Sequence, residues 1–184
     1  MKELTEEEII RGCKNGDPQA QESLYKLLAP KLYAVCLTYL KNKEDAADIL
    51  QEAFIKIFTK INMYKKNGSL EAWARRITVN TIIDFIRKRK STTEFIEAID
   101  PGDVEISSQL PGIIEQLEAK ELQEMIQQLP EGARVAFLMH AVEGYSHEEI
   151  AKELGISVGT SKSQVARARK LLQKMIKERW NAKR

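Results

Sequence analysis

The chain has 184 residues, which is enough for one ordinary domain or two small ones. Its 29 Lys and Arg residues nearly balance its 27 Asp and Glu residues, so the net charge of +2 does not by itself indicate a polyanionic partner. The charges are unevenly placed, however: residues 91–119 contain no Lys or Arg, whereas residues 87–90 and the tail from 162 to 184 are strongly basic.

The remaining composition gives no support to several classes of protein. Cys13 and Cys36 lie far apart, and with only two histidines the sequence shows no metal-ligand spacing, so we expect no metal and no cofactor. There is no nucleophile–base pair and no phosphate-cradling glycine loop, which argues against an enzyme. No apolar run approaches the roughly 20 residues that span a bilayer, and no signal sequence is recognisable. We therefore expect a cytoplasmic protein without membrane insertion.

The first half of the chain predicts four helices. A capping box of Thr5 and Glu8 starts a short helix that ends at Gly16, and Asp17 followed by a proline starts the second. The apolar stripe of this second helix continues past Pro30, where we expect a kink or a break into two pieces. The third helix is predicted over 43–61 and the fourth over 70–90, which ends in the basic run R-K-R-K.

The segment 62–69 interrupts this periodicity with Asn, Gly and Ser and is predicted to be a loop. It places an aromatic ring, Tyr64, beside Lys65 and Lys66, and this combination suits the binding of an unstacked base. An ordinary helix connector explains the loop equally well.

Residues 93–112 are rich in acid and in turn residues, and they predict a flexible linker between domains. Helical patterns resume over 113–129, and a further helix follows Pro130 and closes at Gly144. No strand pattern persists anywhere. The predicted fold is therefore all-α, with two small helical domains, 1–92 and 113–184, joined by a flexible acidic linker.

The stretch 146–169 predicts a helix-turn-helix. Ser146 and Glu149 form a capping box, Gly155 supplies a left-handed stop, and Ser157 can cap the second helix. On that second helix Val158, Val165 and Ala168 are predicted to point inward, and the outer face is formed by Lys162, Ser163, Ala166 and Arg167. A polar basic face is often merely solvated surface, but together with two caps and a glycine turn it favours DNA reading in the major groove.

Three motifs in order carry a resemblance to a known family: E-D-A-A-D-I-L-Q-E-A-F at 44–54, W-A-R-R-I-T-V-N-T-I-I-D-F-I-R-K-R-K at 73–90, and L-P-E-G-A-R-V-A-F-L at 129–138 followed by the helix-turn-helix. Over essentially its whole length the chain resembles a bacterial RNA polymerase sigma factor of the extracytoplasmic-function (ECF) group, in the sigma-70 family. It departs from the usual G-T-V-K-S-R motif at Ser161 and Gln164, where relatives carry Val and Arg. This departure concerns the −35 sequence that is read rather than the role.

The resemblance implies a factor that binds core RNA polymerase and directs promoter-specific initiation by reading the −35 and −10 elements. It further implies a cognate anti-sigma factor as a partner and a linker that threads toward the polymerase active-site cleft. The alternative is a stand-alone helix-turn-helix regulator that does not depend on core polymerase.

The same resemblance, carried residue by residue, implies three sets of site residues. The set for binding core polymerase comprises Asp45, Asp48, Gln51 and Glu52. The set for the −10 element, which is melted to a single strand, comprises Tyr64, Lys65, Lys66, Arg76, Asn80, Arg87 and Lys88. The set for the duplex −35 element comprises Thr160, Lys162, Ser163, Gln164, Ala166, Arg167 and Arg169.

Overall fold

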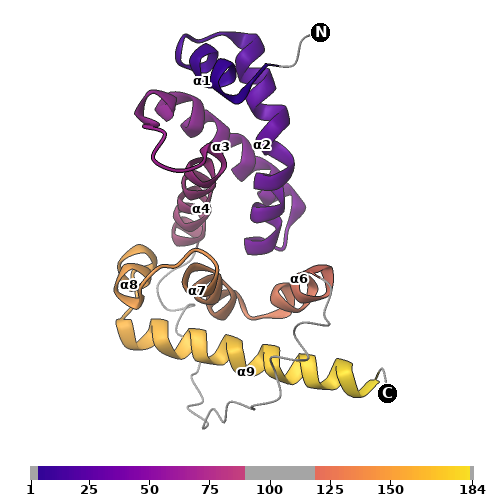
Figure 1. Cartoon of the computed structure of the whole chain (residues 1–184). Helices are drawn as coiled ribbons and strands as arrows, with labels where there is room; N and C mark the ends of the chain where they lie inside the picture. Colours follow the sequence, from indigo (N-terminus) through magenta and orange to yellow (C-terminus); the bar gives the residue numbers. More distant parts are fainter. Residues whose placement is uncertain (1–3, 90–118, 183–184) are drawn as a thin grey trace. The chain divides into compact units, whose positions relative to one another are not determined.

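The computed structural model describes residues 4–89 and 119–182, and within these ranges every regular element is helical (Figure 1). The elements are α1 (Glu6–Lys14), α2 (Pro18–Tyr39), α3 (Lys43–Lys60), a short 3₁₀ turn η1 (Ile61–Met63), α4 (Leu70–Arg89), α6 (Ala119–Gln128), α7 (Glu131–Ala141), α8 (His147–Leu154) and α9 (Val158–Ala182). The predicted all-α class is confirmed. No helix in these ranges is both long and apolar enough to cross a membrane.

The chain divides into two compact units, Met1–Phe85 and Ile86–Arg184. The predicted linker 93–112 and the first residues of the helix predicted at 113–129 lie outside the described residues. The domain limits inferred from the sequence therefore stay a prediction.

The ends of the first helices follow from side chains next to them in the sequence. The hydroxyl of Thr5 accepts a hydrogen bond from the backbone N–H of Glu8, and the Glu8 carboxylate accepts one from the N–H of Thr5 at 2.8 Å. The carboxylate of Asp17 accepts from the N–H of Gln19 at 3.0 Å, with Pro18 in the first helical turn. These bonds satisfy donors that a helix start leaves unpaired, so the predicted helix starts are confirmed.

Helix α2 is not divided at Pro30 and runs from Pro18 to Tyr39 as one element. Pro30 is exposed, so water can reach the backbone carbonyl that loses its partner at a helical proline. Of the two outcomes expected at Pro30, the break into two pieces is wrong, because burial of apolar residues on both sides of Pro30, such as Leu28 and Leu32, holds the two halves in one helix. The expected kink stays a prediction.

Helix α1 packs tightly against α2 in the first unit. A Cβ atom added at Gly12 would lie 2.4 Å from the Cβ atom of Ala20, which is closer than packed carbon atoms approach. The absence of a side chain at Gly12 therefore sets how closely the two helices approach. The core below them consists of apolar side chains of α2 and α3, among them Leu24, Leu32, Ala46, Ala53 and Ile57.

The second unit is organised along α9, against which α6, α7 and α8 pack (Figure 1). Apolar side chains of α7 and α8 cover the inner face of α9, which presents Val165, Ala168, Leu172 and Ile176. This packing turns the opposite face of the first half of α9 toward solvent.

Candidate nucleic-acid and polymerase interfaces

The turn between α8 and α9 has the predicted geometry. The hydroxyl of Ser146 accepts from the N–H of Glu149 at 3.1 Å, and the carboxylate of Glu149 accepts from the N–H of Ser146 at 2.8 Å. Gly155 ends α8 with φ of 67°, a left-handed conformation that is strained for residues with a side chain. The hydroxyl of Ser157 accepts from the N–H of Thr160 at 2.9 Å and so caps the start of α9. These contacts confirm the expected helix starts and the glycine stop.

The outer face of α9 is basic and accessible. Of the three cationic residues on this face, Lys162 and Arg169 are exposed and Arg167 is half-buried. The half-buried members of the predicted −35 set are Thr160, Ser163, Ala166 and Arg167. Two of these are small, so base edges can come close to the helix backbone while the cationic side chains reach outward.

Two polar residues of α9 lie inside the unit rather than on this face. Gln164 is only 2% exposed and Ser161 is fully buried. Gln164 was predicted to contact the −35 element, and this assignment is corrected because its side chain is turned away from solvent. Helical spacing could have revealed this, since Gln164 lies four residues before buried Ala168. The polar character of Gln164 instead suggested an exposed position.

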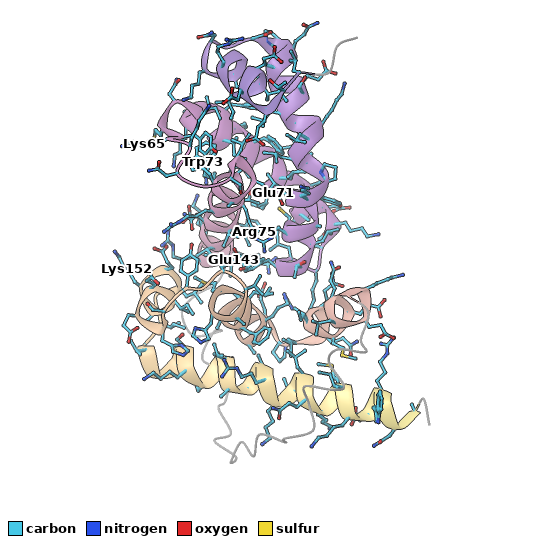
Figure 2. All side chains as sticks on the ribbon, viewed as in Figure 1. Lys65, Glu71, Trp73, Arg75, Glu143 and Lys152 are labelled. Atoms are coloured by element: carbon cyan, nitrogen blue, oxygen red, sulfur yellow. The ribbon has the colours of Figure 1, made fainter. Side chains whose placement is uncertain are left out.

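In the first unit the loop 64–69 follows η1. The ring of Tyr64 is 6% exposed, with its centroid 5.4 Å from the centroid of the Trp73 ring. Its hydroxyl donates to the carbonyl oxygen of Gly68 at 2.8 Å. Tyr64 is therefore a structural residue of the loop, and the expectation that its ring takes a base is corrected. Lys65 and Lys66 remain exposed, and Lys65 projects outward from the loop (Figure 2).

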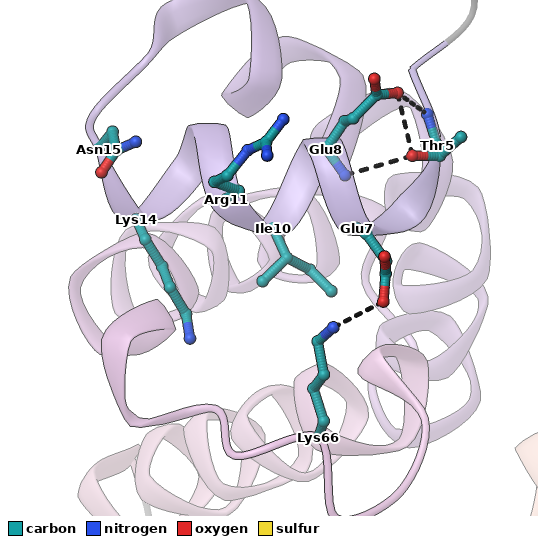
Figure 3. Close-up of a pocket in the computed structure, with 8 residues that line it drawn as sticks. All are labelled: Thr5, Glu7, Glu8, Ile10, Arg11, Lys14, Asn15 and Lys66. Carbon is teal, nitrogen blue, oxygen red and sulfur yellow. Dashed lines mark hydrogen bonds and ion pairs between the residues drawn. The ribbon is translucent and has the colours of Figure 1, made fainter.

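Helix α1 contacts this loop through two side chains (Figure 3). The ammonium group of Lys66 lies 2.8 Å from the carboxylate of Glu7, and that of Lys14 donates to the carbonyl oxygen of Tyr64 at 3.3 Å. The hydrogen bond between Lys66 and Glu7 raises the pKa of the lysine and lowers the pKa of the carboxyl, so both stay charged at neutral pH. Sequence reasoning missed these contacts, because their partners are 50 or more positions apart.

The other members of the predicted −10 set lie on α4. Their side chains are exposed, and Lys88 belongs to the basic last turn of the helix; the residues are Arg76, Asn80, Arg87 and Lys88. Residues 76, 80 and 87 fall on one stripe of the helix, because four residues and seven residues are each close to whole turns. The structure thus places cations along one line of α4.

The residues predicted to bind polymerase lie on α3. Asp48, Gln51 and Glu52 are exposed, Asp45 is half-buried, and the opposite face of the helix is buried through residues such as Leu50. The carboxylate of Glu52 pairs with Lys56 at 2.8 Å. Because Asp48 and Gln51 are exposed on the face of α3 opposite the core, a partner protein can reach them.

A helix-turn-helix with a basic outer face, together with the acidic face of α3 and the basic residues of α4, defines the class: a DNA-binding transcription protein. Comparison with known families makes this specific. Residues 24–92 match the family model "Sigma-70 region 2" and residues 119–172 match "Sigma-70, region 4". The chain belongs to the sigma-70 family, in its ECF group.

Named relatives agree with this membership over most of their length. The ECF RNA polymerase sigma factor SigW of Bacillus subtilis is 30% identical, over 92% of this chain and 95% of its own. The ECF RNA polymerase sigma-E factor of Haemophilus influenzae is 27% identical, over 95% of this chain and 96% of its own. Among solved structures, the sigma factor RpoE from Bartonella quintana, in complex with the anti-sigma factor NepR, is 26% identical with a TM-score of 0.49, over 85% of this chain and 96% of that one.

The resemblance drawn from the motifs is confirmed. The protein is a sigma factor, which binds core RNA polymerase and directs promoter-specific transcription initiation. A stand-alone regulator is not favoured.

Proposed function

We propose that the two DNA-contacting tasks of this sigma factor are divided between helix α9 on the one hand and helix α4 with the loop 64–69 on the other. The outer face of α9 reads the −35 element in the major groove, with Lys162 and Arg167 donating to base edges and Arg169 contacting phosphate. The observation that carries this assignment is the exposed cationic face of α9 within a fully capped helix-turn-helix.

Helix α4 and the loop 64–69 hold the −10 element as a single strand. Arg76, Arg87 and Lys88 of α4 contact its phosphates, Asn80 offers hydrogen bonds to a base, and the loop with Lys65 and Lys66 receives an unstacked base. Because these cations displace counterions from DNA, binding is expected to weaken steeply with salt.

The acidic face of α3 binds core polymerase through Asp48, Gln51 and Glu52, with Asp45 at its edge. The factor works in the cytoplasm by binding rather than by catalysing a reaction of its own. A cognate anti-sigma factor is a further partner implied by family membership.

Run-off transcription tests the whole assignment. Purified core enzyme is supplied with a promoter library, with and without the full chain. We expect promoter-specific products only when the chain and the core enzyme are both present. Tight specific binding to duplex promoter DNA without core enzyme, and no stimulation of transcription, would instead identify a stand-alone regulator.

The polymerase contact is tested by the double change Asp48→Lys and Gln51→Ala. Both side chains are exposed, so the free energy of unfolding should change by no more than about 0.5 kcal/mol. Pull-down of core enzyme should nevertheless fall sharply, because a reversed charge meets a surface complementary to acid.

A matched control is the double change Glu22→Lys and Gln19→Ala, which alters an equally spaced, exposed pair on α2. Circular dichroism melting verifies that both variants fold. Full retention of core enzyme by the folded Asp48 and Gln51 variant would show that this face of α3 is not the interface.

A further inference from the structure

The recognition helix α9 carries a hydroxyl group on its buried face. Ser161 has no exposed surface, and its Oγ atom lies 3.0 Å from Nδ1 of His147, the first residue of α8. A buried hydroxyl without a partner costs free energy, because it has given up its hydrogen bonds to water. The packing of α9 against α8 therefore depends on the position of one imidazole.

That imidazole is itself held by a second histidine. The ring of His147 stacks on the ring of His140 of α7, with centroids 4.4 Å apart and planes inclined by 20°. The Nδ1 atom of His140 lies 2.9 Å from the carbonyl oxygen of Tyr145, in the connection between α7 and α8. Since a carbonyl oxygen only accepts, this Nδ1 atom must carry a hydrogen, which fixes the tautomer and the orientation of the ring.

These contacts form a continuous polar column that consists of the Tyr145 carbonyl group, His140, His147 and Ser161. It joins α7, α8 and α9, the three helices of the DNA-reading region. Ser161 is the neighbour of Lys162, whose exposed side chain is assigned to the major groove. A shift of α9 that accompanied loss of the column would move this cation relative to the bases.

We propose that His140, His147 and Ser161 position the recognition helix, and that His147 does so as a neutral imidazole, so that −35 discrimination falls in acid. This inference rests on the proposed −35 reading by α9. The three residues act through α9 and are positioning residues, since none belongs to the face assigned to DNA.

The charges around His147 favour its neutral form. Burial, the facing His140 of α7, and Lys162 and Arg169 of α9 all lower its pKa, while Glu148 of its own helix raises it, with a net lowering. An imidazole with a lowered pKa contributes its full stabilisation above the unfolded value near 6.5, and loses it as the pH falls through the lowered folded value. Protonation would also place a positive charge against a stacked neighbour and two nearby cations.

Acid has a second, opposite effect on DNA binding. Each proton taken up adds positive charge, which strengthens phosphate contacts to every sequence alike. Total affinity therefore does not report positioning. The ratio of the affinities for a preferred and an altered −35 element does report the position of α9, because phosphate contacts that are the same for both sequences cancel in this ratio.

The test uses polymerase holoenzyme reconstituted with the full chain. The probe is a labelled duplex carrying the −35 element that the wild type prefers in the transcription library, and its partner has two −35 base pairs exchanged. Fluorescence anisotropy gives the ratio of their dissociation constants at pH 7.5 and pH 5.5. The variants are Ser161→Ala, His147→Phe, the double mutant and His147→Asn; Ser23→Ala, which removes a helical hydroxyl from α2, is the control.

We expect Ser161→Ala and His147→Phe each to lower the ratio at pH 7.5 by about 2- to 10-fold, as for loss of one hydrogen bond. The ratio in the double mutant should be no lower than in the more affected of the two single mutants, because both changes break the same contact. His147→Asn should keep most of the ratio, since its amide oxygen can accept from Ser161, and it should lose less of it at pH 5.5 than the wild type does. Ser23→Ala should match the wild type throughout.

Wild-type ratios in both folded single mutants, or equal acid sensitivity of wild type and His147→Asn, would overturn the inference while leaving −35 reading by α9 intact. The absence of any promoter preference in wild-type holoenzyme would overturn the proposed function, and the inference with it. Melting curves verify that each variant folds. At least one informative variant is expected to fold, because alanine at position 161 has a high helix propensity and asparagine at position 147 retains a hydrogen-bond partner for Ser161.

Discussion

The two surfaces proposed to contact DNA differ in how they are built. The reading face of α9 is part of a regular helix, whose backbone is satisfied internally and whose side chains project at fixed intervals. The loop 64–69 has no such repeat. Lys66 and Gly68 adopt positive φ values of 57° and 121°, and the loop is held by side-chain contacts within itself and from α1.

The difference shows where each surface can be disturbed. The direction of a side chain on α9 follows from its position in the helix, so changes in α7 or α8 can shift this face as a whole but do not rearrange the side chains within it. The loop depends on Glu7 and Lys14, which lie more than 45 positions earlier and touch no DNA in the proposed arrangement. Changes in α1 are therefore expected to reach the loop.

The largest effect is expected on the helix. Lys162→Ala or Arg167→Ala should each remove about 1–3 kcal/mol of discrimination between the preferred −35 sequence and its variants, because each loses a base contact. Transcription from a −35 library by holoenzyme measures this. Lys174→Ala is the control, since Lys174 is exposed farther along the same helix. Unchanged preferences in both variants would show that another face of α9 reads the DNA.

The next effect concerns the helix that supports the loop. Gly12→Ala should lower the free energy of unfolding of the first unit by about 1–3 kcal/mol, because its Cβ atom would lie 2.4 Å from the Cβ atom of Ala20. Gly159→Ala is the matched control, because a Cβ atom added at Gly159 would lie 3.6 Å from Ser157 Oγ, an ordinary contact distance. This change should not lower the free energy of unfolding and can raise it by up to about 1 kcal/mol through helix propensity. Urea denaturation measures the free energy of unfolding of both variants and of the wild type. Equal stability would mean that α1 is not closely fitted to α2.

A smaller effect is expected in the loop itself. Lys65→Ala should weaken holoenzyme binding to a single-stranded −10 probe by a similar factor for every sequence, and should reduce the slope of log affinity against log salt by about 0.7. The same change at Lys26, an exposed lysine of α2, should leave the slope unaltered. If Lys65→Ala changed sequence preference but not the salt slope, this lysine would contact a base rather than a phosphate.

The smallest effect is expected for Glu7→Gln, which removes the ion pair of Lys66 but keeps the lysine charge. An exposed pair contributes little, so the preference for a single-stranded −10 probe over the duplex should fall by less than about threefold. The hydrogen bond from Lys66 lowers the pKa of Glu7 below its usual value of 4.5. The ion pair is therefore intact at any pH above 4.5 and is lost as the pH falls through the lowered pKa.

The exchange of Glu7→Lys with Lys66→Glu separates two roles of this pair. Recovery of the preference in the exchanged variant would show that the ion pair positions the loop. A loss in the exchanged variant, with none in Glu7→Gln, would show that Lys66 acts only through its own contact with DNA.

The sequence alone determined the helical class, the helix starts and the turn of the helix-turn-helix. Thr5 with Glu8, Asp17 with Pro18, and Ser157 each act within four residues of their own position. Such contacts depend on the local chain and on few other residues, so their pattern is readable before any packing is known. The exposed acidic face of α3 followed in the same way from helical periodicity.

Only the tertiary structure decided which polar residues face inward. Ser161 is buried because His147, 14 positions earlier, supplies a hydrogen-bond partner. Tyr64 is buried because Trp73 lies against its ring and its hydroxyl finds the Gly68 carbonyl group. A polar group can be buried wherever packing brings it a hydrogen-bond partner, and that partner is chosen by the fold rather than by neighbours in the sequence.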